Sequence, residues 1–163
     1  MSAELQLPQV SVRAVASAQA LYLNSGEHRL FGWLHRRPND SKADLGVVIC
    51  NPFGYEAICS HRGMRAFAEA IAAAGMPAFR FDYSGTGDSA EIDPNADQVQ
   101  VWTRDVLAAA DELRRRTGVG RVCLLGFRLG ALLATLATSE SNSVSALITI
   151  APIISGRDRK SVV

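Results

Sequence analysis

From residue 45 onward, short apolar runs alternate with stretches whose apolar residues recur at helical spacing. This alternation limits the fold more than any other feature of the chain. Residues 45–50, 77–83, 122–125 and 144–154 are strand candidates, and helical spacing is found at 64–72, 99–113 and 129–138. Such an order predicts an α/β fold, with a parallel sheet covered by helices on both faces. Residues 20–23 and 29–35, joined by a turn rich in Asn, Ser and Gly, predict a hairpin before this sheet.

The composition describes an ordinary soluble globular protein. The apolar fraction is 48% and the net charge is +1, so no basic excess indicates nucleic-acid binding. No stretch is apolar enough to span a membrane and no signal peptide is seen, which predicts a cytoplasmic location. Cys50 and Cys123 lie in apolar runs, which favours core thiols over disulfides or metal ligands. We expect neither a metal nor a cofactor, and the oligomeric state stays open.

Residues 126–130, Gly-Phe-Arg-Leu-Gly, end one apolar run and open the next. Glycines two residues either side of Arg128 suit a sharp turn from a strand into a helix, because such a turn leaves little room for Cβ atoms. Where this turn carries a nucleophile, its central residue is Ser, Cys or Asp. Arg128 cannot take that part, since a guanidinium stays protonated and has no lone pair to offer. A generic strand-to-helix turn explains these five residues equally well.

Two further loops follow strand candidates, at residues 51–56 and 84–89. The carboxyl ends of parallel strands share one edge of a sheet, so we expect both loops to gather there with residues 126–130. The glycines of residues 84–87 allow a phosphate cradle or a tight turn. A tight turn is favoured, because the G-x-G-x-x-G spacing of phosphate-binding loops is incomplete.

With these segments in order, residues 21–156 resemble the amino-terminal half of an α/β hydrolase of the serine aminopeptidase-like group. Residues 82–89 are similar to that group's D-x-R-G-x-G-x-S segment, with Ser84 in place of arginine. The segments Asn-Pro-Phe-Gly-Tyr-Glu, Arg-Phe-Asp-Tyr-x-Gly-x-Gly-Asp-Ser and Gly-Phe-Arg-Leu-Gly-Ala together look most like hydrolase-like proteins associated with bacterial exosortase and exopolysaccharide gene clusters.

The resemblance implies three candidate catalytic positions. Arg128 stands at the nucleophile elbow, and the backbone amides of Leu129 and Phe53 are the candidate oxyanion-hole donors. Pro52 has no N–H and cannot contribute. The alternative is that both amides only cap local structure.

The acid and histidine of a triad are missing in the expected order. In this fold both follow the nucleophile, whereas all three histidines precede residue 128 and are expected to be hairpin or loop residues: His28, His35 and His61. The guanidinium of Arg128 has two interpretations. We favour an anchor for an acidic neighbour such as Asp82 or Asp88, because buried arginines are normally paired. The other interpretation is a cation presented to an anionic ligand.

We interpret residues 1–157 as a single incomplete α/β-hydrolase domain, to which a complete hydrolase would add roughly another hundred residues. Residues 158–163 resemble the translation of a sequencing-adapter stretch and are interpreted as a non-native tail, a natural polar tail being the alternative. This chain is expected to be inactive. The intact protein is expected to act on ester, thioester or amide bonds of a small acyl or ester substrate. The alternative is a non-catalytic pseudo-hydrolase, a binding or scaffold protein in exopolysaccharide production.

Overall fold

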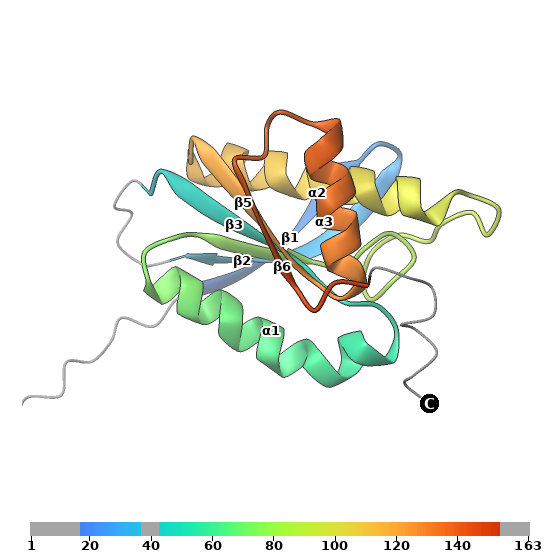
Figure 1. The fold of residues 1–163 in the computed structure, drawn as a ribbon, viewed down its shortest axis with the longest axis horizontal. Helices are drawn as coiled ribbons and strands as arrows, with labels where there is room; N and C mark the ends of the chain where they lie inside the picture. Colours follow the sequence, from blue (N-terminus) through green and yellow to red (C-terminus); the bar gives the residue numbers. More distant parts are fainter. Residues whose placement is uncertain (1–16, 37–42, 154–163) are drawn as a thin grey trace, which may run out of the picture.

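The computed structural model describes residues 17–36 and 43–153, and the predicted tail at 158–163 lies outside them. Within these ranges the chain forms one six-stranded sheet flanked by helices (Figure 1). The strands are β1 (Ser17–Ser25), β2 (His28–Arg36), β3 (Leu45–Cys50), β4 (Ala78–Phe81), β5 (Arg121–Phe127) and β6 (Ala146–Ile150). The helices are α1 (Tyr55–Ala73), α2 (Gln98–Thr117) and α3 (Leu129–Glu140).

The strand order in the sheet is β1-β2-β4-β3-β5-β6. β1 and β2 form an antiparallel hairpin around Gly26, whose φ is 58°. β2 continues antiparallel onto β4, and β4, β3, β5 and β6 then run parallel to one another. The predicted hairpin and the predicted parallel sheet are therefore both confirmed.

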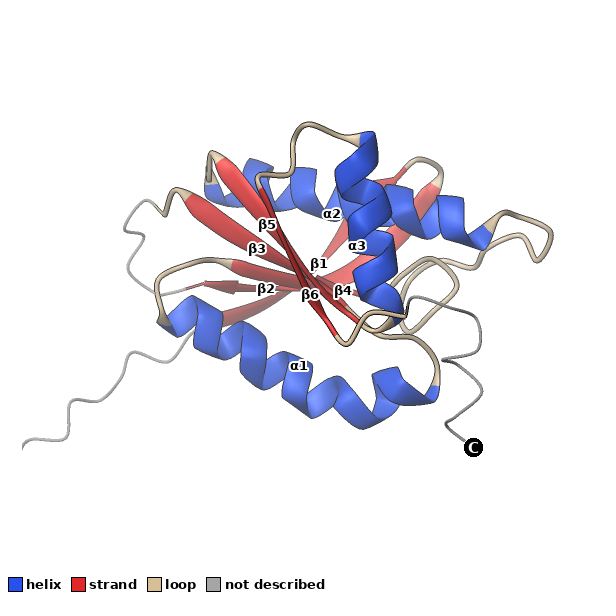
Figure 2. Cartoon of the chain, in the orientation of Figure 1, coloured by secondary structure: helices blue, strands red, loops and turns tan. Residues whose placement is uncertain are grey.

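The helices cover both faces of the sheet, as the alternation of elements predicts. α1 packs on one face, and α2 and α3 pack on the other (Figure 2). β3 lies between the two layers, where Val48 and Ile49 are fully buried on opposite faces. Cys50 and Cys123 are buried as expected, while Cys59 is exposed. None of the helices in the described ranges is long and apolar enough to cross a membrane.

Helix α1 is longer than its apolar spacing predicts. The pattern begins at Met64, whereas the helix begins at Tyr55. The first turns of α1 have no buried apolar face: Tyr55 and Ile58 are 73% and 75% exposed. Apolar periodicity therefore does not mark them. The expectation that His61 lies in a loop is consequently wrong, since it lies within α1.

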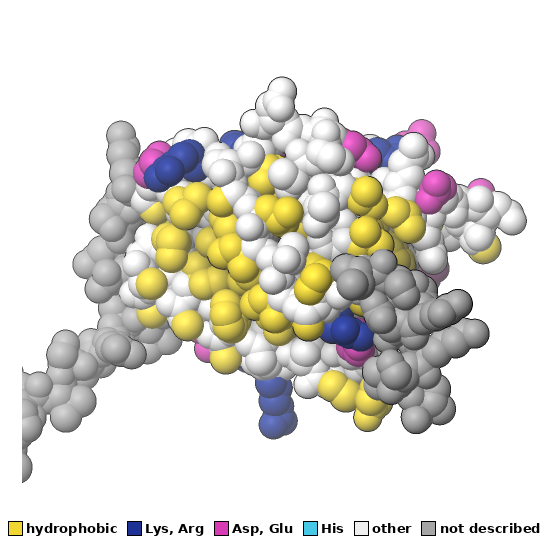
Figure 3. Space-filling model, in the orientation of Figure 1, with side chains coloured by type: hydrophobic (Ala, Val, Ile, Leu, Met, Phe, Trp, Pro, Cys, Tyr) yellow, Lys and Arg dark blue, Asp and Glu magenta, His cyan; other side chains and the backbone are white. Residues whose placement is uncertain are grey.

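Strand β6 forms one edge of the sheet within the described residues. It is shorter than the predicted 144–154, and Ile148 and Ile150 are 51% and 37% exposed. Pairing with Leu125 and Phe127 places both isoleucines on the sheet face that α1 covers further along. Apolar side chains gather in this part of the surface (Figure 3).

Candidate functional site

The turn after β5 consists of a single residue. β5 ends at Phe127 and α3 begins at Leu129, so Arg128 alone changes the chain direction. Its φ of 54° and ψ of −116° lie in a region that residues other than glycine rarely adopt. The Arg128 N–H donates to the Ile150 carbonyl oxygen over 3.0 Å, which fixes the turn to the end of β6.

Close packing explains the two glycines around this turn. A Cβ atom at position 126 would overlap the backbone of Ala131, and one at position 130 would overlap the carbonyl oxygens of Cys50 and Asn51. Helix α3 therefore begins directly against the ends of β5 and β3. This contact places the turn at residue 128 beside the loop that follows β3.

The Arg128 side chain anchors an acidic neighbour, in line with the favoured interpretation. Its Nε donates to Glu56 Oε1 over 3.0 Å, and its Nη1 donates to the Ala151 carbonyl oxygen over 3.4 Å. The prediction that Asp82 or Asp88 pairs with Arg128 is wrong. Glu56 takes their place because α1 begins at residue 55 and carries this carboxylate in its first turn.

The two candidate oxyanion-hole amides belong to neighbouring segments. Leu129 is the first residue of α3, where an N–H has no acceptor within the helix. Phe53 lies in the loop between β3 and α1, and its ring packs against Trp102 with a centroid separation of 4.8 Å. Their role as oxyanion donors stays a prediction.

The loop after β4 is a tight turn whose amides are already used. Gly85 and Gly87 adopt φ values of 76° and 52°. Amide N–H groups that donate inside the loop or to its flanks are those of Gly85, Thr86, Asp88 and Ser89, over 2.7, 2.9, 3.1 and 3.0 Å. Few donors remain for an anion, which supports the tight turn over the phosphate cradle.

Helix α2 holds the loop after β4 in place through two hydrogen bonds. The buried Asp105 carboxylate accepts the Ser84 N–H over 2.8 Å, and the Trp102 indole donates to the Ser84 carbonyl oxygen over 2.8 Å. Ser84 is itself fully buried. The loop is therefore tied to the core on the side away from α1.

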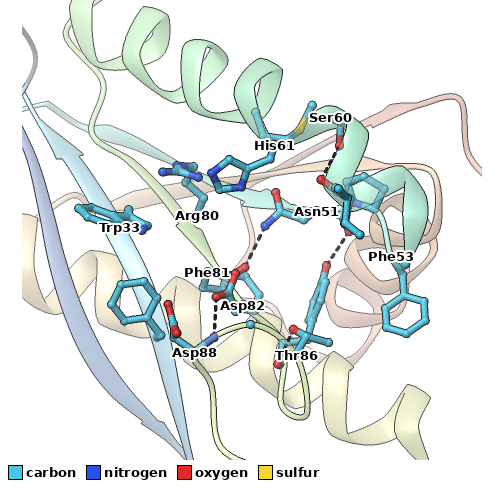
Figure 4. A pocket seen from close by; sticks show the side chains of 18 of the residues that line it. Trp33, Asn51, Phe53, Ser60, His61, Arg80, Phe81, Asp82, Thr86 and Asp88 are labelled. Atoms are coloured by element: carbon cyan, nitrogen blue, oxygen red, sulfur yellow. Dashed lines mark hydrogen bonds between the residues drawn. The ribbon is translucent and has the colours of Figure 1, made fainter.

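Two of the three expected loops line a cleft of about 930 Å³, together with β2 and the first half of α1 (Figure 4). Among its polar and aromatic lining residues are Trp33, Asn51, His61, Arg80, Asp82 and Asp88. Residues 126–130 do not line it. The expectation that all three loops gather at one edge of the sheet is confirmed, and two of them, residues 51–56 and 84–89, contribute to the cleft.

The charged groups of the cleft include a buried cation. Arg80 is 7% exposed, and its Nε donates to His35 Nε2 over 3.0 Å. Burial, and then the charge of Arg80, lower the pKa of His35 to about 4. Burial raises the pKa of the Asp82 carboxyl. The sequence analysis did not identify Arg80 as a site residue. A charged residue in the middle of the apolar run 77–83 is a signal that could have found it.

Comparison with known proteins decides the family. The model of the family described as serine aminopeptidase, S33 matches residues 33–162. The chain belongs to this family. No curated protein sequence matches the chain significantly. The resemblance to the serine aminopeptidase-like group is thus confirmed.

Solved structures share the fold of this serine aminopeptidase family member. A hypothetical protein of Pseudomonas aeruginosa has a TM-score of 0.75 and 23% identity over 93% of the chain. A lidless α/β serine hydrolase of Xanthomonas campestris has a TM-score of 0.67 and 24% identity over 83%. An esterase of Pyrococcus furiosus has a TM-score of 0.69 and 19% identity over 84%. The fold is the α/β-hydrolase fold.

The chain is short for this fold. It spans 49%, 62% and 50% of those three structures, respectively.

Proposed function

We propose that this chain is the amino-terminal part of a cytoplasmic α/β-hydrolase-like protein that binds small acyl or ester compounds beside Arg128 without hydrolysing them. The observation that carries the proposal is the state of Arg128. It occupies the position of a nucleophile on a turn with positive φ, and its guanidinium is held by Glu56. A protonated guanidinium in an ion pair offers no electron pair for attack on a carbonyl.

The sheet edge supports the view that more of the protein follows. Ile148 and Ile150 expose apolar side chains on an edge strand, and such surface is normally covered in a finished domain. The three structures named above are longer than this chain and have the same fold. We accordingly assign the missing cover to a carboxyl-terminal part of the intact protein.

An assay with a chromogenic ester tests the absence of hydrolysis. The chain and its Arg128→Ala variant are incubated with p-nitrophenyl acetate, and binding of phenyl acetate is followed in parallel as a shift of the melting temperature. We expect p-nitrophenol release at the buffer rate for both proteins and a melting shift that saturates. The proposal would be overturned if the chain released p-nitrophenol above the buffer rate and the Arg128→Ala variant did not. It would also be overturned if phenyl acetate caused no melting shift.

A second candidate is that the intact protein hydrolyses ester, thioester or amide bonds. It is favoured by the amides of Leu129 and Phe53, which lie in adjoining segments where this fold forms an oxyanion hole. One structural neighbour is an esterase. Turnover by the intact protein, measured on the same ester beside its Arg128→Ser variant, would establish this candidate. Inactivity of the parent in that assay would leave the binding role.

We extend the binding role to exopolysaccharide production, where the protein would serve as a binding or scaffold partner. Support comes from the three sequence segments that resemble exosortase-associated proteins. Deletion of the gene in its host, with complementation by the Arg128→Ser variant, provides the test. Normal exopolysaccharide output after deletion contradicts the extension.

A further inference from the structure

Arg80 is a buried cation that forms no ion pair within the described residues. It lies on β4 with 7% of its surface exposed, on the sheet face that α1 covers. In the parts of the chain that the structure describes, no carboxylate oxygen lies within 4.0 Å of its nitrogens. Its one hydrogen bond there runs from Nε to His35 Nε2. A guanidinium has five N–H donors, so four are left for other partners.

His35 does not neutralise this charge. Its Nε2 accepts from Arg80, which leaves the proton of the neutral ring on Nδ1. The nearby carboxylates act on this charge only from a distance. Burial lowers the pKa of Arg80, and the charges of Asp82 and Glu69 oppose this. Glu69 itself pairs with Arg65 over 2.8 Å, and Asp82 accepts the Asp88 N–H over 3.1 Å. A buried cation with no carboxylate in direct contact is unfavourable, which points to an anion that binds from outside the chain.

The free edge of Arg80 opens into the cleft. Arg80 and His61 both line it, and Figure 4 shows the His61 ring of α1 beside the Arg80 guanidinium of β4. Trp33 is the register partner of Arg80 on β2, with the guanidinium carbon 6.0 Å from its ring centroid. Phe31 extends the aromatic wall along the same strand. A cationic corner therefore adjoins an apolar wall.

We propose that this cleft binds a small organic carboxylate, with its anionic group on Arg80 and His61 and its apolar body against Trp33 and Phe31. An Arg fork matches the two oxygens of a carboxylate. A volume of about 930 Å³ is far larger than an inorganic ion needs and falls within the range of small-molecule sites.

The acidic side of the cleft selects a single negative charge. Asp82 and Asp88 line the cleft at the loop after β4, next to the Phe31 end of β2, where the Asp82 N–H donates to the Phe31 carbonyl oxygen over 2.9 Å. Their carboxylates repel a second charge on the ligand, which disfavours a phosphate dianion relative to a carboxylate. Residues 126–130 do not line the cleft, so the carboxylate site does not include Arg128.

Calorimetric titration of the full chain near neutral pH tests the ligand class. The probes are phenylacetate, its neutral analogue phenylacetamide, phenyl phosphate and inorganic phosphate. We expect one phenylacetate per chain, bound about tenfold or more tightly than each of the other three. Absence of saturable heat with phenylacetate would overturn the proposal. Equal binding of phenylacetamide, or tighter binding of either phosphate, would also overturn it.

Two variants locate the site. Arg80→Gln removes the buried cation, and His61→Glu places a negative charge on the exposed side of α1. His61 lines the cleft, so the new carboxylate would repel the ligand. Both variants are expected to weaken phenylacetate binding about tenfold or more. Arg115→Gln removes a cation from α2 on the opposite face and is expected to change nothing. If Arg80→Gln does not fold, His61→Glu decides alone, and unchanged affinity in that variant refutes the assignment.

Discussion

The Nε atom of Arg128 lies 3.0 Å from Oε1 of Glu56, although 72 residues separate them in sequence. This ion pair joins the turn after β5 to the first turn of α1. A carboxylate in the first turn of a helix is favoured by the helix dipole, and Arg128 adds a second favourable interaction. The arginine thus joins the starts of two helices from a turn with positive φ.

Replacing Arg128 separates backbone strain from the ion pair. Arg128→Ala and Arg128→Gly both remove the pair with Glu56, but only glycine tolerates a φ of 54° with a ψ of −116°. We expect the glycine variant to be the more stable of the two by about 1 kcal/mol, measured by urea denaturation.

The matched control for this comparison is Arg104, an exposed residue inside α2. In a helix the order reverses, and Arg104→Gly should be less stable than Arg104→Ala by about 1 kcal/mol. An alanine variant at 128 that equals or exceeds the glycine variant would mean that the turn is unstrained.

Gly130 tests the close approach of α3 to β3. Gly130→Ala would drive a Cβ atom into the carbonyl oxygens of Cys50 and Asn51, which belong to backbone and cannot move aside cheaply. We expect a loss of about 3 kcal/mol or more in the free energy of unfolding. Gly63, inside α1, is the control, because a Cβ atom added there would meet nothing within 4 Å. Gly63→Ala should stabilise by about 0.5–1 kcal/mol, and similar effects at both positions would contradict the packing argument.

Much of the fold could be predicted because burial and periodicity coincide in it. β3 reads as a continuous apolar run since Val48 and Ile49 face two covered layers. The start of α1 could not be predicted in the same way. Its first turns face solvent and the cleft, so residues such as Tyr55 and Ile58 follow no apolar stripe.

The site was predictable in its backbone and less so in its side chains. Gly126 and Gly130 identify the turn at Arg128, because a steric demand on Cβ atoms is local and leaves a trace in the sequence. The partner of Arg128 was not predictable, since Glu56 reaches it through the packing of α1 against the end of β5. The cleft around Arg80 depends on the same tertiary arrangement.

Asp105 holds the loop after β4 through one buried hydrogen bond to the Ser84 N–H. Asp105→Ala leaves that donor buried without an acceptor, which costs about 1–3 kcal/mol. Asp105→Asn keeps an oxygen that can accept and removes a buried charge, so we expect a smaller loss. Chemical denaturation of both variants checks the order. Asp111, an exposed α2 residue, provides the control, and both of its substitutions should stay within about 0.5 kcal/mol. Equal losses for the two Asp105 variants would show that the hydrogen bond to Ser84 does not stabilise the loop.

His35 makes the stability of the chain depend on pH. Its pKa is lowered from 6.5 to about 4, first by burial and then by Arg80 on β4, with a smaller lowering by Arg65 and an opposing effect of Glu69 on α1. The unfolded chain therefore takes up a proton near pH 6.5, which the folded chain does not accept until about pH 4. The stabilising contribution is complete above pH 6.5 and is lost as the pH falls toward 4. A difference of this size corresponds to about 3 kcal/mol.

Urea denaturation across this pH range, with the chain beside its His35→Gln variant, measures that contribution. The variant has no titrating group at position 35, so the slope of its unfolding free energy between pH 4 and 6.5 should be smaller than that of the parent by about one proton. His28→Gln is the matched control, because His28 lies at the hairpin end of the same strand and is not buried. It should keep the parent slope. Parallel pH profiles for the parent and His35→Gln would contradict a buried neutral histidine.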